Sequence, residues 1–150
     1  MSDRLRHGFI IALFAAMLAH AADDPSTPAR DAPRDARLEA ARAAIATKDW
    51  GAAQAVLREA LAADPANAEY HNLYAYAVRS GPNPAMDVVF RHYHEALRLD
   101  PRHRGAHEYI GEAYLLVNEP VKAKEHLAAL DKLCFFGCSE YTELKQAIAA

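Results

Sequence analysis

Apolar residues recur at helical spacing through most of the chain after residue 35, and small residues alternate with large ones within that pattern. In one stretch Ile110, Gly111 and Tyr114 are followed by Ala123 and Leu130. Small residues let two antiparallel helices approach closely, and large residues fill the space above and below. The pattern therefore predicts a helical hairpin over residues 104–133, with Gly111 packed near Ala123. Such a hairpin cannot bury its apolar face alone.

Two Asp-Pro pairs mark where further helices end. Asp64-Pro65 and Asp100-Pro101 lie 36 residues apart, and each follows an alanine-rich or leucine-rich helical segment. Proline cannot continue a helix, and it disfavours helical geometry in the residue before it. A small residue also follows ten positions after each proline. The chain is therefore expected to repeat the same helical hairpin.

The flanks of this repeat predict additional helices. Asp49 is a suitable N-cap for a helix that starts at Trp50, and an alanine-rich helix is expected before it, from about Asp35 to Ala46. Ser139 is an N-cap candidate for a last helix. The expected fold is all-α: antiparallel helical-hairpin repeats in an α-solenoid of about seven helices. We place the repeats at 35–66, 67–102 and 103–136 and a C-terminal capping helix at 139–150.

The N-terminus has the pattern of a secretory signal peptide. Arg4 and Arg6 precede an apolar run over residues 8–19, and small residues follow at Ala19 and Ala21. The run is shorter than the about 20 residues that span a bilayer. We therefore predict a signal peptide over 1–21 and an exported protein, periplasmic or secreted. An uncleaved anchor or a buried helix is the alternative.

The segment 22–34 is predicted to be a disordered linker. It holds Pro25, Pro28 and Pro33 among acidic residues and shows no apolar periodicity. The formal net charge of the whole chain is −3, which offers no electrostatic basis for nucleic-acid binding. No other segment predicts membrane insertion after signal cleavage.

The order of large and small residues resembles the tetratricopeptide repeat (TPR) family, in which a large residue, a Leu-Gly-like pair and an aromatic precede Ala-x-x-x-aromatic. The resemblance covers 35–136 and is clearest in the third hairpin, although Phe135 stands where the family has proline. The family repeat is about 34 residues, and the two extra residues here are expected in the Gly/Pro-rich loop 80–84.

Members of this family are scaffolds that bind peptide segments or helices of other proteins in a concave groove, and the resemblance implies that function here. The positions that line the groove in this family correspond here to both polar and apolar residues. The predicted groove residues are Arg42, Glu69, Asn72, Tyr76, Arg79, Glu108, Glu112 and Leu115. The simpler interpretation is that these residues are only exposed. The family's lysine-rich clamp for C-terminal carboxylates is absent.

Cys134 and Cys138 are expected to form a structural disulfide. The predicted export signal and the even cysteine count favour it, and Gly137 allows a turn between them. Free thiols, or a redox or metal function, are the alternatives. The spacing is not that of a thioredoxin-like Cys-x-x-Cys motif.

The spacing of the histidines is only weak evidence for a metal site. His103 and His107 are four residues apart and are expected on one helix face, but no His-Glu-x-x-His motif accompanies them. We favour the interpretation that His71 and His107 fill packing positions. No nucleotide-binding glycine loop or Gly-x-Ser-x-Gly occurs. The sequence therefore predicts no catalytic residue, no cofactor and no metal site.

Three hypotheses remain for function. The first is a non-enzymatic scaffold that binds a peptide or helix of a partner protein of unknown identity. The second is a metal-handling or thiol-redox accessory protein that uses Cys134, Cys138 and nearby histidines. The third is a structural capping or assembly subunit.

Overall fold

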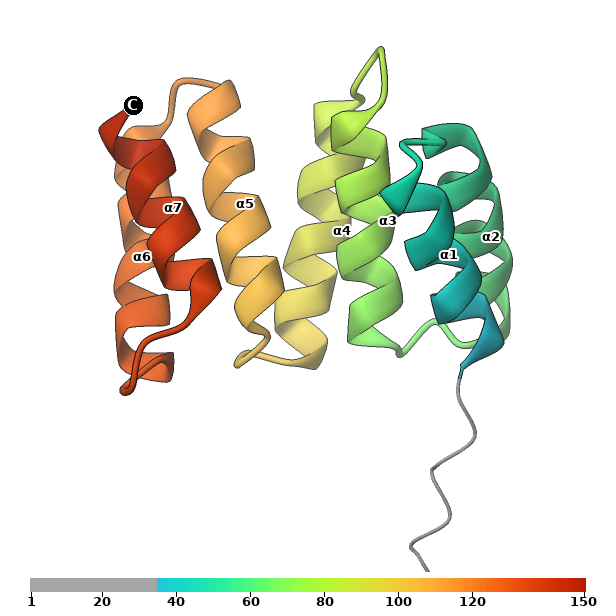
Figure 1. The fold of residues 1–150 in the computed structure, drawn as a ribbon, viewed down its shortest axis with the longest axis horizontal. Coiled ribbons are helices and arrows are strands. Elements are labelled where there is room, and N and C mark those ends of the chain that lie inside the picture. The colour runs from blue at the N-terminus through green and yellow to red at the C-terminus, as the bar shows by residue number, and fades with distance from the viewer. Residues whose placement is uncertain (1–34) are drawn as a thin grey trace, which may run out of the picture. The chain divides into compact units, whose positions relative to one another are not determined.

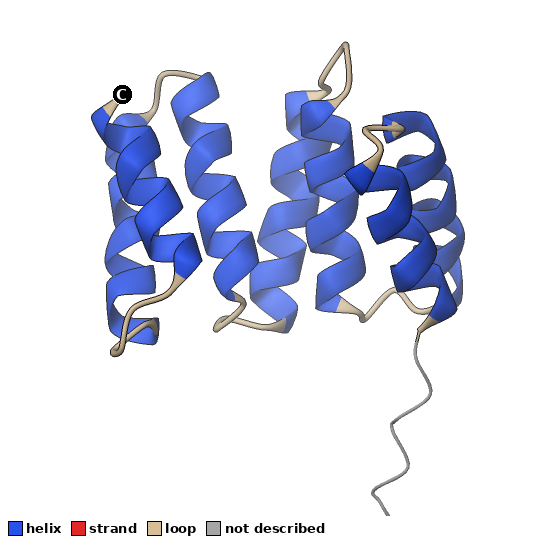
Figure 2. Cartoon of the chain, in the orientation of Figure 1, coloured by secondary structure: helices blue, strands red, loops and turns tan. Residues whose placement is uncertain are grey.

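The computed structural model describes residues 35–150, and these form seven helices and no strand (Figure 2). The predicted signal peptide and linker lie outside the described residues. The all-α prediction is confirmed. The helices are α1 (Ala36–Ala46), α2 (Trp50–Ala63), α3 (Ala68–Ser80), α4 (Met86–Leu99), α5 (Arg104–Leu116), α6 (Pro120–Leu133) and α7 (Ser139–Ala149).

Consecutive helices pair into three hairpins, α1 with α2, α3 with α4 and α5 with α6 (Figure 1). The first helices of the hairpins form one layer together with α7, and the second helices form the layer behind it (Figure 1). Each hairpin also contacts the next one, and α7 packs on both α5 and α6. The fold is therefore a helical solenoid whose last hairpin is covered by a capping helix, as predicted.

Side-chain caps define most helix starts. Asp35, Asp49, Asn67 and His103 each accept a hydrogen bond from a backbone N–H in the first turn of the following helix, which satisfies donors that a helix start leaves free. The prediction for Asp49 is confirmed. The two Asp-Pro pairs end α2 and α4, because Asp64 and Asp100 are the C-cap residues.

The predicted cap of the last helix is wrong by one residue. Ser139 is the first residue of α7, and Cys138 is the N-cap, with its sulfur accepting from the Tyr141 N–H at 3.4 Å. The Ser139 hydroxyl instead lies 3.3 Å from Glu140. Cys138 takes the cap position because its backbone is extended there.

Gly111 is crowded by α7 rather than by α6. A Cβ atom at this position would lie 2.6 Å from Cδ2 of Leu144, and the next two nearest atoms belong to the same side chain. The atoms nearest to a Cβ at Gly111 therefore belong to Leu144 on α7, and not to Ala123, the neighbour that the sequence predicts. The reason is topological: α7 occupies the place beside α5 that the first helix of another hairpin would take. Leu144 is fully buried.

Cys134 and Cys138 are joined as a disulfide at the turn between α6 and α7, with the sulfur atoms 2.05 Å apart. Gly137 lies between them with φ of +86°, a conformation that side chains disfavour. The predicted pairing and turn are both present. In the described part of the chain, no helix combines the length and apolar character that crossing a membrane requires.

Candidate functional site

A pocket of about 490 Å³ opens on the layer of first helices. It draws residues from α1, α3, α5 and α7, so it spans all three hairpins and the capping helix. Its lining combines charged and polar side chains with apolar surface of similar extent. The lining residues are Arg42, Ile45, Ala46, Glu69, Asn72, Leu73, His103, Gly105, Glu108, Tyr109, Ser139, Glu140 and Glu143.

Four of the eight predicted groove residues meet in this pocket: Arg42, Glu69, Asn72 and Glu108. The family-derived positions thus converge from three separate helices. Glu108 differs from the expectation of a groove-wall residue, because only 4% of its surface is exposed. Asn72 is also buried, at 2% exposure.

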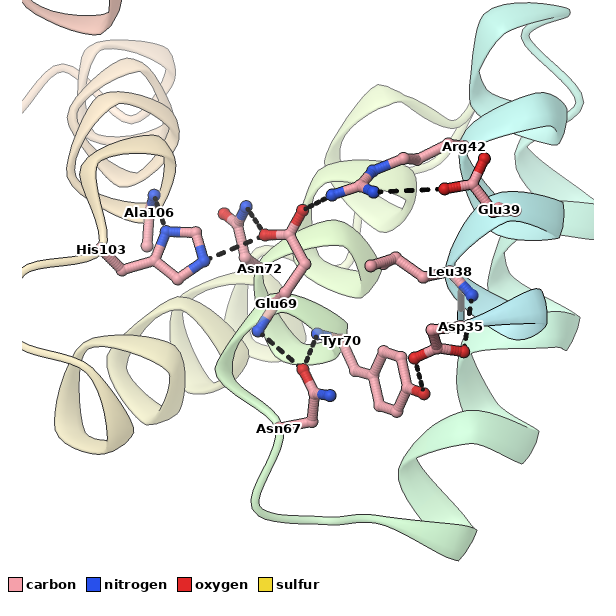
Figure 3. A network of polar contacts seen from close by, with 10 residues as sticks. All are labelled: Asp35, Leu38, Glu39, Arg42, Asn67, Glu69, Tyr70, Asn72, His103 and Ala106. Carbon is pink, nitrogen blue, oxygen red and sulfur yellow. Dashed lines mark hydrogen bonds and ion pairs between the residues drawn. The ribbon is translucent and has the colours of Figure 1, made fainter. Parts of the chain in front are cut away.

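Glu69 is the centre of a polar network that joins three helices (Figure 3). Its carboxylate accepts from Arg42 Nη2 at 2.8 Å, from Asn72 Nδ2 at 3.1 Å and from His103 Nε2 at 3.0 Å. Burial raises the pKa of Glu69, but these hydrogen bonds outweigh burial and lower it. Glu69 is therefore an ionised, fully engaged carboxylate.

His103 has a defined tautomer in this network. Its Nδ1 atom accepts from the Ala106 N–H at 3.2 Å, so a neutral ring carries its proton on Nε2 and donates it to Glu69. His103 is the N-cap of α5, and His107 points to a different helix, where it faces His126. The expectation that His103 and His107 share one face is therefore wrong, because His103 precedes the helical turns.

Tyr76, Arg79 and Glu112 form a second cluster together with Tyr109. Arg79 Nη2 donates to Glu112 at 2.7 Å, and the guanidinium carbon lies 5.4 Å from the centroid of the Tyr76 ring and 5.7 Å from that of Tyr109. The Tyr76 ring also packs against Trp50, with centroids 6.0 Å apart. Tyr76 is consequently half-buried among aromatic neighbours and does not line the pocket.

Leu115 is half-buried near the end of α5 and lines neither the pocket nor the second cluster. Both predicted groove cations, Arg42 and Arg79, are already paired with predicted groove carboxylates, Glu69 and Glu112. The groove residues therefore bind one another across successive hairpins.

The remaining carboxylates make the pocket acidic. Glu140 pairs with Arg104 at 3.5 Å. No basic side chain among residues 35–150 forms an ion pair with Glu108 or Glu143. Burial, together with the nearby Glu143 carboxyl, raises the pKa of Glu108 to about 8. At neutral pH Glu108 is therefore largely protonated.

Two histidine pairs repeat at equivalent places in the second and third hairpins. Nδ1 of His71 lies 2.9 Å from Nδ1 of His92, and the same distance separates these atoms in His107 and His126. Nε2 of His71 and of His107 lies 3.0 Å and 3.2 Å from a proline carbonyl oxygen, which can only accept. These two rings therefore carry their proton on Nε2, and their partners donate from Nδ1.

The pairs are packing elements of the hairpins. Burial and, next in size, the facing histidine lower the pKa of His92 and of His126 to about 4. His71 is buried, in agreement with the predicted packing role. Within the described range no three histidine, cysteine or carboxylate side chains converge closely enough to hold a metal ion.

Sequence reasoning missed His103, Tyr109, Glu140 and Glu143 as pocket residues. Glu140 and Glu143 lie in the first turns of α7, for which the sequence predicts only a capping role. The signal available was the periodicity itself: a helix after a complete hairpin joins the layer of first helices and so contributes to the same surface.

No protein-family model matches this chain, and no curated protein matches it either.

Proposed function

We propose that this protein is a non-enzymatic scaffold of the TPR type that binds a segment of a partner protein on its layer of first helices. The observation that carries the proposal is the pocket itself, which is lined from α1, α3, α5 and α7. A surface assembled from successive repeats suits an extended segment, which can contact several hairpins at once.

The composition of the pocket supports recognition of a segment. It combines charged side chains, an amide and the Tyr109 ring with apolar side chains that include Leu73. Interfaces that bind peptides use a few polar groups for register and an apolar or aromatic contact for affinity. The family assignment rests on the pattern of small and large residues, and the stacking of successive helical hairpins agrees with that pattern.

The alternative of a metal-handling or thiol-redox protein has less support. Cys134 and Cys138 are disulfide-bonded at the turn before α7, and the histidines pair with one another or with Glu69. In residues 35–150 these side chains do not gather into a group of three. We therefore retain the binding scaffold as the proposed function.

Site-specific photo-crosslinking tests the proposal. A photoreactive amino acid is placed at Ser139, which is exposed and lines the pocket, and separately at Arg58, which is exposed on α2 in the other layer. After irradiation in extract of the source cells, Ser139 is expected to give discrete adducts with a partner protein. Arg58 should not give them.

Equal adducts from both positions would indicate non-specific capture and contradict a binding site on the first helices. The crosslinked peptide of the partner, identified by mass spectrometry, should come from a short contiguous segment. Adducts spread over a folded domain of the partner would instead favour the structural assembly subunit.

A further inference from the structure

We infer that the pocket takes a basic side chain, lysine or arginine, from an extended segment of the partner protein. This inference rests on the proposed scaffold function and specifies the chemistry of the partner. The juxtaposition that carries it is two carboxyls without a cation, Glu108 and Glu143, in one pocket with the Tyr109 ring and the amide of Asn72.

The basic side chains that line the pocket already bind other groups of the protein. Arg42 donates to Glu69 at 2.8 Å and lies 3.7 Å from Glu39. The neutral His103 ring uses both nitrogens, one as the cap of α5 and the other on Glu69. An acidic segment would therefore have to displace an existing ion pair to find a cation here.

Two carboxyl groups of the pocket, in contrast, have no cationic partner. Neither Glu108 nor Glu143 belongs to any ion pair formed within residues 35–150. The pocket lining holds four carboxyl groups against the single arginine Arg42. A lysine or arginine side chain would supply the missing charge and several N–H donors together.

Asn72 gives an independent indication of a missing donor. Its side-chain nitrogen donates to Glu69, which orients the amide (Figure 3). Its Oδ1 atom is buried and has no hydrogen-bond partner. A buried acceptor without a donor costs free energy, so this oxygen is suited to receive an N–H from a ligand. Asn72 lines the same pocket as the two unpaired carboxyls.

The arrangement of the oxygen atoms in the pocket favours an organic cation over a metal ion. Metal binding requires several ligands to converge on one point, and no group of three candidate ligands does so in the described region. A lysine or arginine head group spreads its donors over a larger volume. Tyr109 adds an aromatic ring, which attracts such cations.

Binding of a cation should be linked to release of a proton. Burial and the Glu143 carboxyl raise the pKa of Glu108, so the group is mostly protonated at neutral pH, and a cation beside it would favour the ionised form. The affinity should therefore rise with pH. The other charged or titratable groups around this part of the fold are Glu140 and Glu143 on α7, Glu112 and Tyr109 on α5, His103 before α5, Glu69 on α3 and Arg42 on α1.

The test uses the full chain and three capped peptides of equal length, in which alanine alternates with lysine, norleucine or glutamate. Binding is measured by calorimetry and by amide chemical-shift changes. The lysine peptide is expected to bind, with shifts centred on α3, α5 and the start of α7. Its affinity should rise between pH 6 and 8.5, on the order of tenfold if one ionisation dominates.

Matched variants separate the pocket from general acidity. Glu108→Gln with Glu143→Gln should weaken lysine-peptide binding by about tenfold or more. Glu59→Gln with Glu125→Gln makes the same two substitutions at exposed positions outside the pocket and should change affinity by less than about twofold. Glu143→Gln alone tests the same site at an exposed residue, where folding is not at risk.

Each other outcome overturns a distinct claim. Equal weakening by both double variants would show non-specific attraction to an acidic surface. Binding of the norleucine or glutamate peptide in preference to lysine, with shifts on the same helices, would contradict the basic side chain and leave the scaffold function standing. Failure of all three peptides to bind would contradict the basic side chain, and crosslinking from Ser139 would then decide the scaffold function separately.

Discussion

At the scale of single residues, Glu108 shows how a buried carboxyl makes stability depend on pH. Burial raises its folded-state pKa to about 8, above the ordinary value of 4.5. The folded protein therefore binds more protons than the unfolded chain between these values, and stability falls as pH rises through this window. Below about pH 4.5 the group is protonated in both states and has no effect.

We predict that Glu108→Gln stabilises the protein in a pH-dependent manner. Glutamine keeps the shape of the protonated carboxyl and cannot ionise. Above pH 8 the free energy of unfolding of the variant should exceed that of wild type by on the order of 2–4 kcal/mol. This difference should decrease towards zero as the pH approaches 4.5. Denaturant titrations at several pH values measure this. A gap that does not vary with pH would show that Glu108 is not buried as described.

Gly111 is a residue-scale test of the solenoid packing. Leu144 leaves no room for a Cβ at position 111, so Gly111→Leu should cost roughly 1–3 kcal/mol or more by overpacking. In a Leu144→Ala background the new side chain has space, and the same substitution should cost much less. The double-mutant cycle should give a coupling energy of about 0.5–3 kcal/mol.

Additive effects of the two substitutions would contradict the contact between α5 and α7. Because Ala123 is small and buried on α6, Ala123→Gly serves as the control background. Gly111→Leu should remain costly there, since the crowding side chain is on another helix.

At the scale of elements, the histidine pairs join the two helices of the second and third hairpins. His71 on α3 faces His92 on α4, and His107 on α5 faces His126 on α6. One proton bridges the two Nδ1 atoms of each pair. Burial and the facing histidine disfavour a further positive charge on His92 or His126. The hairpins are therefore sensitive to acid.

We predict that His92→Asn together with His126→Asn reduces the loss of stability in acid. The folded pKa of both histidines is about 4 and their ordinary value is 6.5, so the unfolded chain binds more protons between these values. Stability of the wild type should then fall as pH decreases from about 6.5 to 4. The amide nitrogen of asparagine can replace the Nδ1–H donor without titrating.

Thermal melts from pH 7 to 4 measure the difference. Wild type and variant should diverge progressively below about pH 6.5. His94→Asn is the control, because His94 is exposed and belongs to neither pair. An acid profile shared by all three proteins would contradict the role of the pairs.

The disulfide is expected to stabilise α7 in particular. It closes a short loop, so its effect on global stability should lie at the low end of about 2–4 kcal/mol. We predict that Cys134→Ser with Cys138→Ser lowers stability only modestly but raises hydrogen exchange in α7, whose N-cap is Cys138. Exchange in α1, at the other end of the stack, should be unchanged.

Mass spectrometry of the unreduced wild type should show a deficit of two hydrogens relative to the dithiol. Two alkylatable thiols in protein from oxidising extract would contradict the bond. Uniformly faster exchange in every helix would show instead that the disulfide stabilises the entire domain.

At the scale of the whole molecule, charge pairing ties the repeats together. The Arg42–Glu69–His103 network joins the first hairpin to the third through the second, and Arg79–Glu112 joins α3 to α5. These pairs lie on the layer that carries the pocket. A ligand that binds there therefore contacts side chains whose positions depend on the stacking of several hairpins.

Export of the whole chain is a prediction from the sequence pattern of residues 1–21, which lie outside the described residues. We predict cleavage after Ala21, because small residues at Ala19 and Ala21 follow the apolar run. N-terminal sequencing of the exported protein should begin at Ala22. An intact Met1 on membrane-bound protein would show that the segment is an anchor.

The amino-acid sequence by itself determined the local structure. Helix ends at Asp64-Pro65 and Asp100-Pro101, the cap at Asp49 and the turn at Gly137 depend on backbone restrictions within a few residues. The spacing of small and large residues likewise indicated stacked hairpins, since that periodicity records which face must be buried.

Only the tertiary structure decided how side chains from different helices meet. Glu69 and His103 are 34 residues apart, and Gly111 and Leu144 are 33 apart, so their contacts depend on the stacking angle and register of helices. Burial of Glu108 depends equally on where α7 packs. Its altered pKa, and the acidity of the pocket, follow from loss of solvent and from neighbouring charge, which no local pattern of residues specifies.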